Sequence, residues 1–314
     1  MMRVFHHLAA PGRGAVILAT LAALSACATA PTDLSGAAPF GPLPGGISAF
    51  LEDGPWPVDV LLDSFESEYG CTVSYEQYRP KSASGASDAA GHRPLVVLAH
   101  GFLRNLEQMR GWASHWASYG VESVVLSFCN SGVFRGNHDR NADDLIAAAE
   151  LLAGPDRPII YAGYSAGGLS ALLATAADER SVAYLGLDPV DSGDLAAGIG
   201  ALEVPALYLH GEPDRCNADN NMIPVTPPSS RRLALRARFA THCDFEAPTD
   251  DVCVRLCGEI VPEEMEVAVR NTIRAVSDAW IFEHAGILPE GALSESLVDQ
   301  LAAAGRIVRV SGLP

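Results

Sequence analysis

The segment 159–174 constrains the fold more than any other part of the chain. Ile159 to Ala162 is a short apolar run that predicts a buried strand, and Leu169 to Ala174 is rich in helix-forming residues. Between them stands Gly163-Tyr-Ser-Ala-Gly167. A serine on a sharp turn from strand to helix has strained backbone angles, and flanking glycines let both elements approach closely. An ordinary glycine-rich turn is the alternative, but the flanking elements favour a turn that presents Ser165 as a nucleophile.

Apolar strand candidates and helix candidates alternate along the rest of the chain. Continuous apolar runs are typical of strands that are covered on both faces. The alternation predicts an α/β fold with a mainly parallel central sheet and helices on both faces. No internal repeat or break divides residues 58–314, so we expect one domain there. The predicted strands are Cys71–Arg79, Leu95–Ala99, Val121–Phe128, Ile159–Ala162, Val182–Leu187, Pro205–Leu209, Leu235–Thr241 and Arg306–Val310, and the main helices are Leu106–Tyr119, Asn141–Leu152 and Glu263–His284.

Reactive side chains follow the predicted strands at the points where the strands end. The carboxyl ends of parallel strands meet at one edge of a sheet, where functional residues of such folds gather. The sequence therefore predicts that a cluster forms there from Ser165, Asp188, Asp214, His100 and His242.

A serine hydroxyl needs a neighbouring base to become a nucleophile, and histidine can take and return a proton near neutral pH. The histidine in turn needs a carboxylate that fixes its tautomer. His242 lies in a loop just after a predicted strand and follows Ser165 in the chain order expected of a serine, acid and histidine triad. Asp188 and Asp214 both lie between them, and the residue pattern alone leaves the choice of acid open.

Three further motifs indicate a family. Gly186-Leu-Asp-Pro-Val-Asp191, then Cys216-Asn217, then His242-Cys-Asp-Phe245 resemble the chlorophyllase branch of the α/β-hydrolase superfamily and its dienelactone-hydrolase and polyester-hydrolase relatives. The resemblance covers residues 58–285. It implies an α/β-hydrolase fold and a serine-dependent carboxylic-ester hydrolase that acts on a small ester. It also implies that Asp188 is the acid, as in chlorophyllases, with Asp214 as the alternative, as in polyester hydrolases.

A negative charge that develops on a reacting carbonyl oxygen needs two fixed N–H donors. We expect the backbone of Ala166, the residue after the nucleophile, and of Phe102, in the loop after Leu95–Ala99, to supply them. Ala166 stands where plant chlorophyllases carry a larger basic residue. Tyr164, beside the nucleophile, is expected to help shape the acyl pocket. An acyltransferase or amidase with the same triad, or a non-catalytic binding lipoprotein, is the alternative function.

The N-terminal residues 1–27 have the pattern of an export signal. Arg3 and Arg13 precede an apolar stretch from Ala15 to Leu24, which is too short to span a bilayer as a mature helix. Leu24-Ser-Ala-Cys27 resembles the bacterial lipobox, so Cys27 is expected to carry the lipid anchor. With Ala28 next to it, this implies the periplasmic face of the outer membrane of a Gram-negative bacterium. Residues 28–57, rich in Pro, Gly, Ala and Ser, are predicted to be a flexible tether.

Charge and cysteine content limit the partners. The formal net charge of −17 argues against a nucleic-acid partner, because phosphates would be repelled. No glycine-rich phosphate loop, dinucleotide fingerprint or zinc-ligand spacing is present, so we expect neither a cofactor nor a metal. Apart from Cys27, six cysteines in an exported domain predict disulfides, and one at Cys243 would stiffen the loop that holds His242. We expect a monomer.

Overall fold

The computed structural model describes residues 40–81, 93–130, 136–258 and 262–311. The predicted signal segment, Cys27 and the first part of the predicted tether lie outside these residues. The described strands form one nine-stranded sheet with the order β1-β2-β4-β3-β5-β6-β7-β8-β9. In chain order they are β1 (Val58–Glu66), β2 (Thr72–Pro80), β3 (Leu95–Ala99), β4 (Ser123–Ser127), β5 (Ile159–Tyr164), β6 (Ser181–Leu187), β7 (Ala206–His210), β8 (Arg232–Ala237) and β9 (Ile307–Arg309).

The middle of the sheet is parallel, and both edges are antiparallel. Strands β4, β3, β5, β6, β7 and β8 pair in parallel, whereas β1 with β2, β2 with β4, and β8 with β9 pair antiparallel. Every residue of β3, β5 and β7 is buried, which is why these strands are continuous apolar runs in the sequence. Strand β1 is largely exposed on both faces and has no clear alternation of apolar and polar residues, so the hydrophobicity pattern did not reveal it. The prediction of an α/β fold with a mainly parallel sheet is confirmed.

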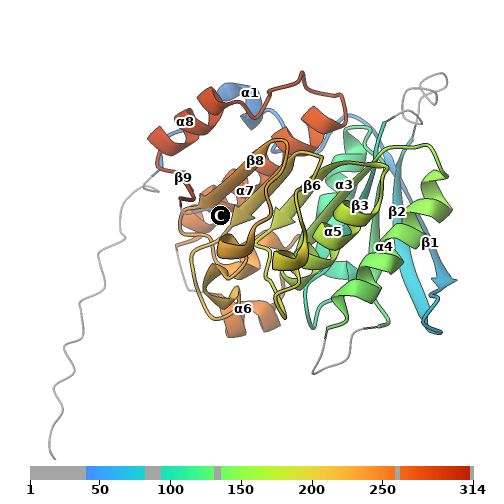
Figure 1. Cartoon of the computed structure of the whole chain (residues 1–314). Coiled ribbons are helices and arrows are strands. Elements are labelled where there is room, and N and C mark those ends of the chain that lie inside the picture. Colours follow the sequence, from blue (N-terminus) through green and yellow to red (C-terminus); the bar gives the residue numbers. More distant parts are fainter. Residues whose placement is uncertain (1–39, 82–92, 131–135, 259–261, 312–314) are drawn as a thin grey trace, which may run out of the picture. The chain divides into compact units, whose positions relative to one another are not determined.

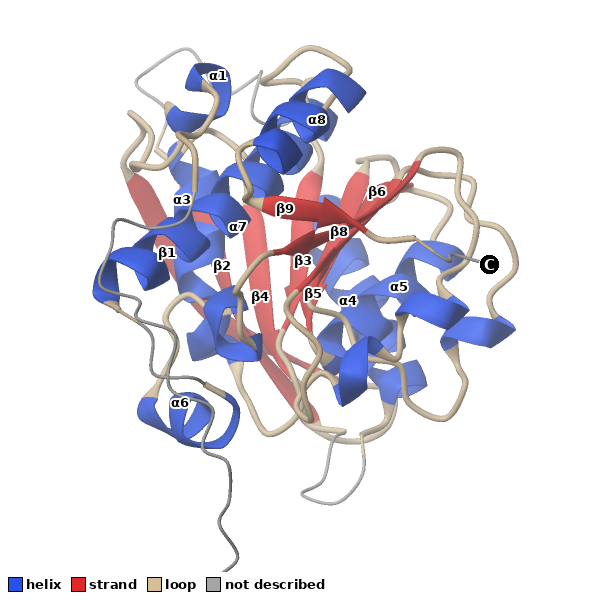
Figure 2. Cartoon of the chain, turned by 90° about the vertical axis from the view of Figure 1, so that its left-hand side faces the viewer, coloured by secondary structure: helices blue, strands red, loops and turns tan. Residues whose placement is uncertain are grey.

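Helices cover both faces of the sheet (Figures 1 and 2). Side chains of a strand alternate between the faces, so Val96 and Leu98 of β3 belong to one core and Leu95 and Val97 to the other. The first core includes α3 and α7, and the second includes α4 and α5. The described α-helices are α1 (Gly45–Ser48), α3 (Arg110–Ser118), α4 (His138–Ala153), α5 (Ala166–Ala177), α6 (Asp251–Cys257), α7 (Glu263–His284) and α8 (Glu295–Ala303).

The strand predicted over Leu235–Thr241 ends earlier, at Ala237. Phe239 has a positive φ of 61°, which an extended strand does not permit. Thr241 and Asp244 then form a reciprocal cap that starts a short 3-10 helix, η5 (His242–Phe245). His242 is therefore the first residue of η5, held by its cap, rather than the residue directly after a strand.

The second half of the predicted tether is packed rather than free. Ile47 of α1 is only 3% exposed and belongs to the core, and the Phe50 ring contacts Tyr119 and Phe282. The N–H of Gly41 also donates to a backbone carbonyl near the end of α8. Pro, Gly and Ala dominate this stretch, and its few large apolar residues are what attach it to the domain. Among the described residues, no helix is long and apolar enough to cross a membrane.

Candidate functional site

Ser165 lies on the tight turn between β5 and α5. Its φ of 55° and ψ of −127° are strained for a residue with a side chain. A Cβ atom on Gly163 would stand 2.3 Å from the carbonyl oxygen of Gly167, and one on Gly167 would stand 2.2 Å from that of His100. Both positions therefore require glycine. The strand–turn–helix unit predicted from the sequence is present, with Ser165 at its tip.

Three buried side chains form a continuous chain of hydrogen bonds at the carboxyl end of the sheet. The Ser165 hydroxyl donates to Nε2 of His242 at 2.9 Å, and Nδ1–H of His242 donates to Oδ2 of Asp188 at 2.6 Å. A carboxylate can only accept, so the proton of the neutral imidazole is assigned to Nδ1. Ser165, His242 and Asp188 are 7%, 5% and 0% exposed. This arrangement lets the histidine accept a proton from the serine.

Asp188 is held as an anion by its neighbours. Complete burial opposes its ionisation, yet the hydrogen bond from His242 and the N–H of Gly211 hold the pKa of its carboxyl below the usual range. The Asn217 amide adds a third donor, at 3.2 Å from Oδ2, and its Nδ2 also donates to the carbonyl of Glu212. A buried carboxylate with this many donors can stabilise a positive charge on His242.

Asp214, the alternative acid, has a different position. Its carboxylate accepts the backbone N–H groups of Cys216 and Asn217, and its own N–H donates to the Asn217 side chain. These contacts make it the organiser of the turn after β7. Of the two aspartates left open by the residue pattern, the structure brings Asp188 to His242.

The loop that holds Phe102 is shaped by His100. Nδ1–H of His100 donates to the carbonyl of Gly101 at 2.8 Å, and its Nε2 accepts the N–H of Phe128 at 3.2 Å. Burial lowers the pKa of His100 to about 4, so the ring is neutral and both contacts persist near neutral pH. A Cβ on Gly101 would stand 3.0 Å from Cβ of Ser165, so the loop lies directly against the serine. His100 is thus a structural residue.

Ala166 is the first residue of α5, so the helix itself offers no acceptor for its N–H. Phe102 lies across the site on the loop after β3, and both residues line a cavity of about 620 Å³ that also includes Ser165. The two backbones expected to supply N–H donors therefore border the space in front of the serine. The positive end of α5 adds to the favourable potential there.

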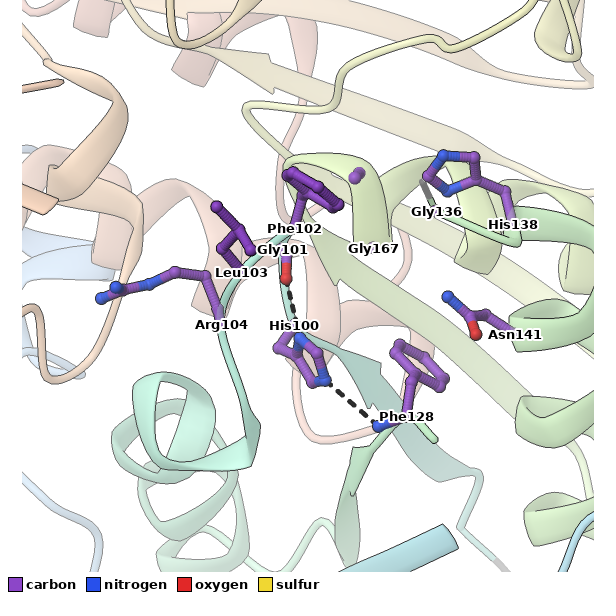
Figure 3. Close-up of a pocket in the computed structure, with 11 residues that line it drawn as sticks. His100, Gly101, Phe102, Leu103, Arg104, Phe128, Gly136, His138, Asn141 and Gly167 are labelled. Atoms are coloured by element: carbon purple, nitrogen blue, oxygen red, sulfur yellow. Dashed lines mark hydrogen bonds between the residues drawn. The ribbon is translucent and has the colours of Figure 1, made fainter. Parts of the chain in front are cut away.

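Two larger cavities meet at Ser165. The first, of about 440 Å³, is bounded by Tyr164, His242 and α6. The second, of about 620 Å³, extends toward the start of α4. A smaller one of about 140 Å³ is lined by Phe102 and Phe128, and Figure 3 shows His138 and Asn141 projecting toward it from α4. Tyr164 is almost fully buried, with its ring 4.8 Å from that of His242, and it borders the first cavity.

Two of the three disulfides in the described part of the chain brace this site. The pairs are Cys71–Cys129, Cys216–Cys257 and Cys243–Cys253. The sequence predicted paired cysteines, and the pairings themselves come from the structure. The sulfurs of Cys243, Cys253 and Cys257 lie within 4.8 Å of one another, which is close enough to bind one metal ion. All three sulfurs belong to disulfides. Helix α6 is thereby joined to the residue after His242 and to the residue before Asn217.

Sequence reasoning missed His138 as a site residue. Helix α4 was predicted to begin at Asn141, and it begins three residues earlier, so His138 opens it. It lines the cavities of about 140 and 620 Å³. Its position in the sequence could have indicated it, because His138 follows β4 and the carboxyl end of β4 borders the site.

The chain as a whole matches no protein-family model and no curated protein. The geometry of Ser165, His242 and Asp188 is therefore the basis for assigning a function.

Proposed function

We propose that this chain is a serine-dependent carboxylic-ester hydrolase with an α/β-hydrolase fold of the chlorophyllase-like branch. The observation that carries the proposal is the unbroken hydrogen-bond chain from Ser165 through His242 to Asp188. Its order and atoms are those of a nucleophile, a general base and an orienting carboxylate. Asp188 is also the aspartate of the Gly186–Asp191 motif on which the resemblance rests.

In this mechanism Oγ of Ser165 attacks the ester carbonyl carbon while Nε2 of His242 takes its proton. The carbon–oxygen bond to the alcohol then breaks, and His242 returns the proton to the leaving oxygen. Water attacks the acyl-enzyme, gives a proton to His242, and releases the acid as Oγ of Ser165 recovers that proton.

Charge is stabilised at two places during these steps. Asp188 stabilises the imidazolium form of His242, and the N–H groups of Phe102 and Ala166 stabilise the oxyanion of the tetrahedral intermediate. The strained angles of Ser165 and the hydrogen bonds of His100 hold the serine and the Phe102 loop in place before substrate arrives.

Labelling with a fluorophosphonate tests this proposal. The oxidised protein should be labelled at Ser165 and should hydrolyse short p-nitrophenyl esters, and Ser165→Ala should abolish both. Ser181→Ala is the matched control, because Ser181 is also buried but starts β6 and lies outside the site. A wild-type protein that neither labels nor hydrolyses esters would be a binding protein instead, and the proposal would be wrong.

We further propose that the protein is anchored at the cell envelope through a lipid on Cys27. Support comes from the Leu24–Cys27 motif and from three disulfides, which persist in oxidising compartments. Cys27→Ser should move the protein from the membrane fraction to the soluble fraction. Retention of this variant in membranes would contradict the anchor.

A further inference from the structure

The two cavities that meet at Ser165 differ in chemistry and are divided by the catalytic groups. Among the described residues, Phe102, Ser165 and Cys216 line both. His242 lines only the cavity of about 440 Å³, whereas Ala166 lines only that of about 620 Å³. An ester bound at Ser165 must therefore place its two halves on opposite sides of the serine.

We propose, on the basis of the ester hydrolase activity proposed above, that the substrate is an ester of an apolar alcohol and a polar, non-anionic acid. The alcohol half occupies the cavity beside α6, and the acyl half occupies the cavity beside α4, where His138 is its specificity-determining residue.

The position of His242 decides the orientation. Its Nε2 must deliver a proton to the leaving alcohol oxygen, so that oxygen must lie on the His242 side of the reacting carbon. The cavity on that side is the one that includes Tyr164 and α6. The acyl group, which stays on Ser165 after the alcohol leaves, must then extend to the other side.

The cavity on the alcohol side is apolar. Leu103, Val252 and Leu256 line it, and they are 63%, 57% and 55% exposed. Arg104 and Arg215 also line it. The guanidinium of Arg104 is committed to Glu246 and Asp250, and that of Arg215 donates to the backbone carbonyl of Leu256. Apolar side chains gain from being covered, and each methylene added to the alcohol should raise kcat/KM by up to about fourfold until the cavity is filled.

The cavity on the acyl side is polar. His138 is 8% exposed, and its Nδ1 is buried without a hydrogen-bond partner in the described structure. Burial lowers the pKa of His138, although Asp139 and the backbone of Ala166 oppose this, so the ring is a neutral donor and acceptor. A buried polar atom without a partner is costly, so a small shift of the ring that brings Nδ1 to a hydroxyl on the acyl group would be favoured.

The negative charge in the acyl-side cavity disfavours an anionic acyl group. The described residues that line this cavity include Asp139 and Asp191 and no lysine or arginine. One oxygen of Asp191 is occupied by the N–H of Ala196. A carboxylate on the acyl group would therefore meet negative charge, whereas a hydroxyl or an amine would not.

Two constitutional isomers test the orientation without any mutation. Hexyl 3-hydroxybutanoate has the polar group on the acid, and 3-hydroxybutyl hexanoate has it on the alcohol. We expect the oxidised wild-type protein to hydrolyse the first with a kcat/KM at least about tenfold higher, since several methylenes move into the apolar cavity. Hexyl hydrogen succinate, which is anionic on the acyl side, should be the poorest substrate. Equal rates for the isomers, or the reverse order, would overturn the inference.

Substitutions at two positions, His138 and Leu256, test which residues produce this preference. His138→Leu should bring the kcat/KM ratio of hexyl 3-hydroxybutanoate to hexyl butanoate down toward one, and His138→Gln should partly restore it. Leu256→Ser should lower the ratio of hexyl to methyl 3-hydroxybutanoate. Leu151→Ser is the matched control, an equally exposed leucine on α4 outside the three cavities, and it should change neither ratio. If Ser165 labels and esters are hydrolysed but these ratios stay fixed, only the present inference fails; if nothing labels, the proposed function fails first.

Discussion

At the residue scale, Asn217 supports the carboxylate of Asp188. Asn217 is fully buried, its amide group donates to both oxygens of Asp188, and its side-chain oxygen accepts the N–H groups of Asp214 and Asn220. One side chain therefore links the turn that Asp214 organises to the carboxylate that faces His242. Such support fixes the direction of the carboxylate, which matters as much as its charge.

The two aspartates are predicted to respond differently to the same substitution. Asp188→Asn should lower kcat by about 10⁴-fold, because His242 would lose both its tautomer control and the stabilisation of its charged form. Asp214→Asn should lower Tm, since the carboxylate caps its own turn, but should keep most of kcat. Steady-state kinetics with a short p-nitrophenyl ester, beside thermal melts, separate the two. A large loss of kcat in Asp214→Asn with a near-normal Asp188→Asn would reverse the assignment.

At the element scale, the strands and helices that were predictable are those whose burial is complete. Helix α7 runs from Glu263 to His284 as predicted, and the strands from β3 to β7 lie within two residues of the predicted bounds. Element ends that depend on local backbone conformation were not predictable. Strand β8 ends before a residue with a positive φ, and α4 begins at His138, about one turn earlier than predicted. The choice of acid also needed the fold, because only the fold brings Asp188, just after β6, to His242 at the start of η5.

The disulfides of α6 are predicted to matter for activity more than for stability. Cys243–Cys253 closes only 10 residues and Cys216–Cys257 closes 41, whereas Cys71–Cys129 closes 58. Longer loops lose more entropy when closed, so Cys71→Ser/Cys129→Ser should cost the most in the free energy of unfolding. The two pairs on α6 should cost the most in kcat, because they adjoin His242 and Asn217. Paired denaturation and kinetic measurements should give these opposite orders, and parallel orders would contradict the role assigned to α6.

At the scale of the whole molecule, buried histidines tie stability to pH. Burial lowers the pKa of His100, His210 and His284 to about 4. Each has an ordinary pKa near 6.5 when the chain is unfolded. Between these values the unfolded chain binds protons that the folded protein does not, so the free energy of unfolding falls as the pH falls from about 6.5 to about 4. The stabilisation is fully present above the unfolded pKa.

Removing one of these histidines should weaken the pH dependence. His284 packs against Trp280, with the ring centroids 4.4 Å apart, and lies away from the side chains of Ser165, Asp188 and His242. His284→Phe should keep that packing and remove about a third of the contribution that these three histidines make to acid destabilisation. Urea denaturation of variant and parent at about pH 7 and about pH 4.5 gives the change in the free energy of unfolding between the two pH values. Subtracting the change in the variant from that in the parent removes the contribution of the other titrating groups. An unchanged difference between the two pH values would show that His284 does not titrate in this window.

The pairing of Cys216 with Cys257 also determines how this protein responds to a single proteolytic cleavage. Every peptide bond between residues 217 and 256 lies inside the covalent loop that this disulfide closes. A protease that cuts once in that stretch, including anywhere in exposed α6, produces two pieces that remain one molecule. Such a nicked protein would run as an intact chain on a gel until it is reduced, and would keep Ser165 and His242 covalently connected even when the cut separates them in sequence.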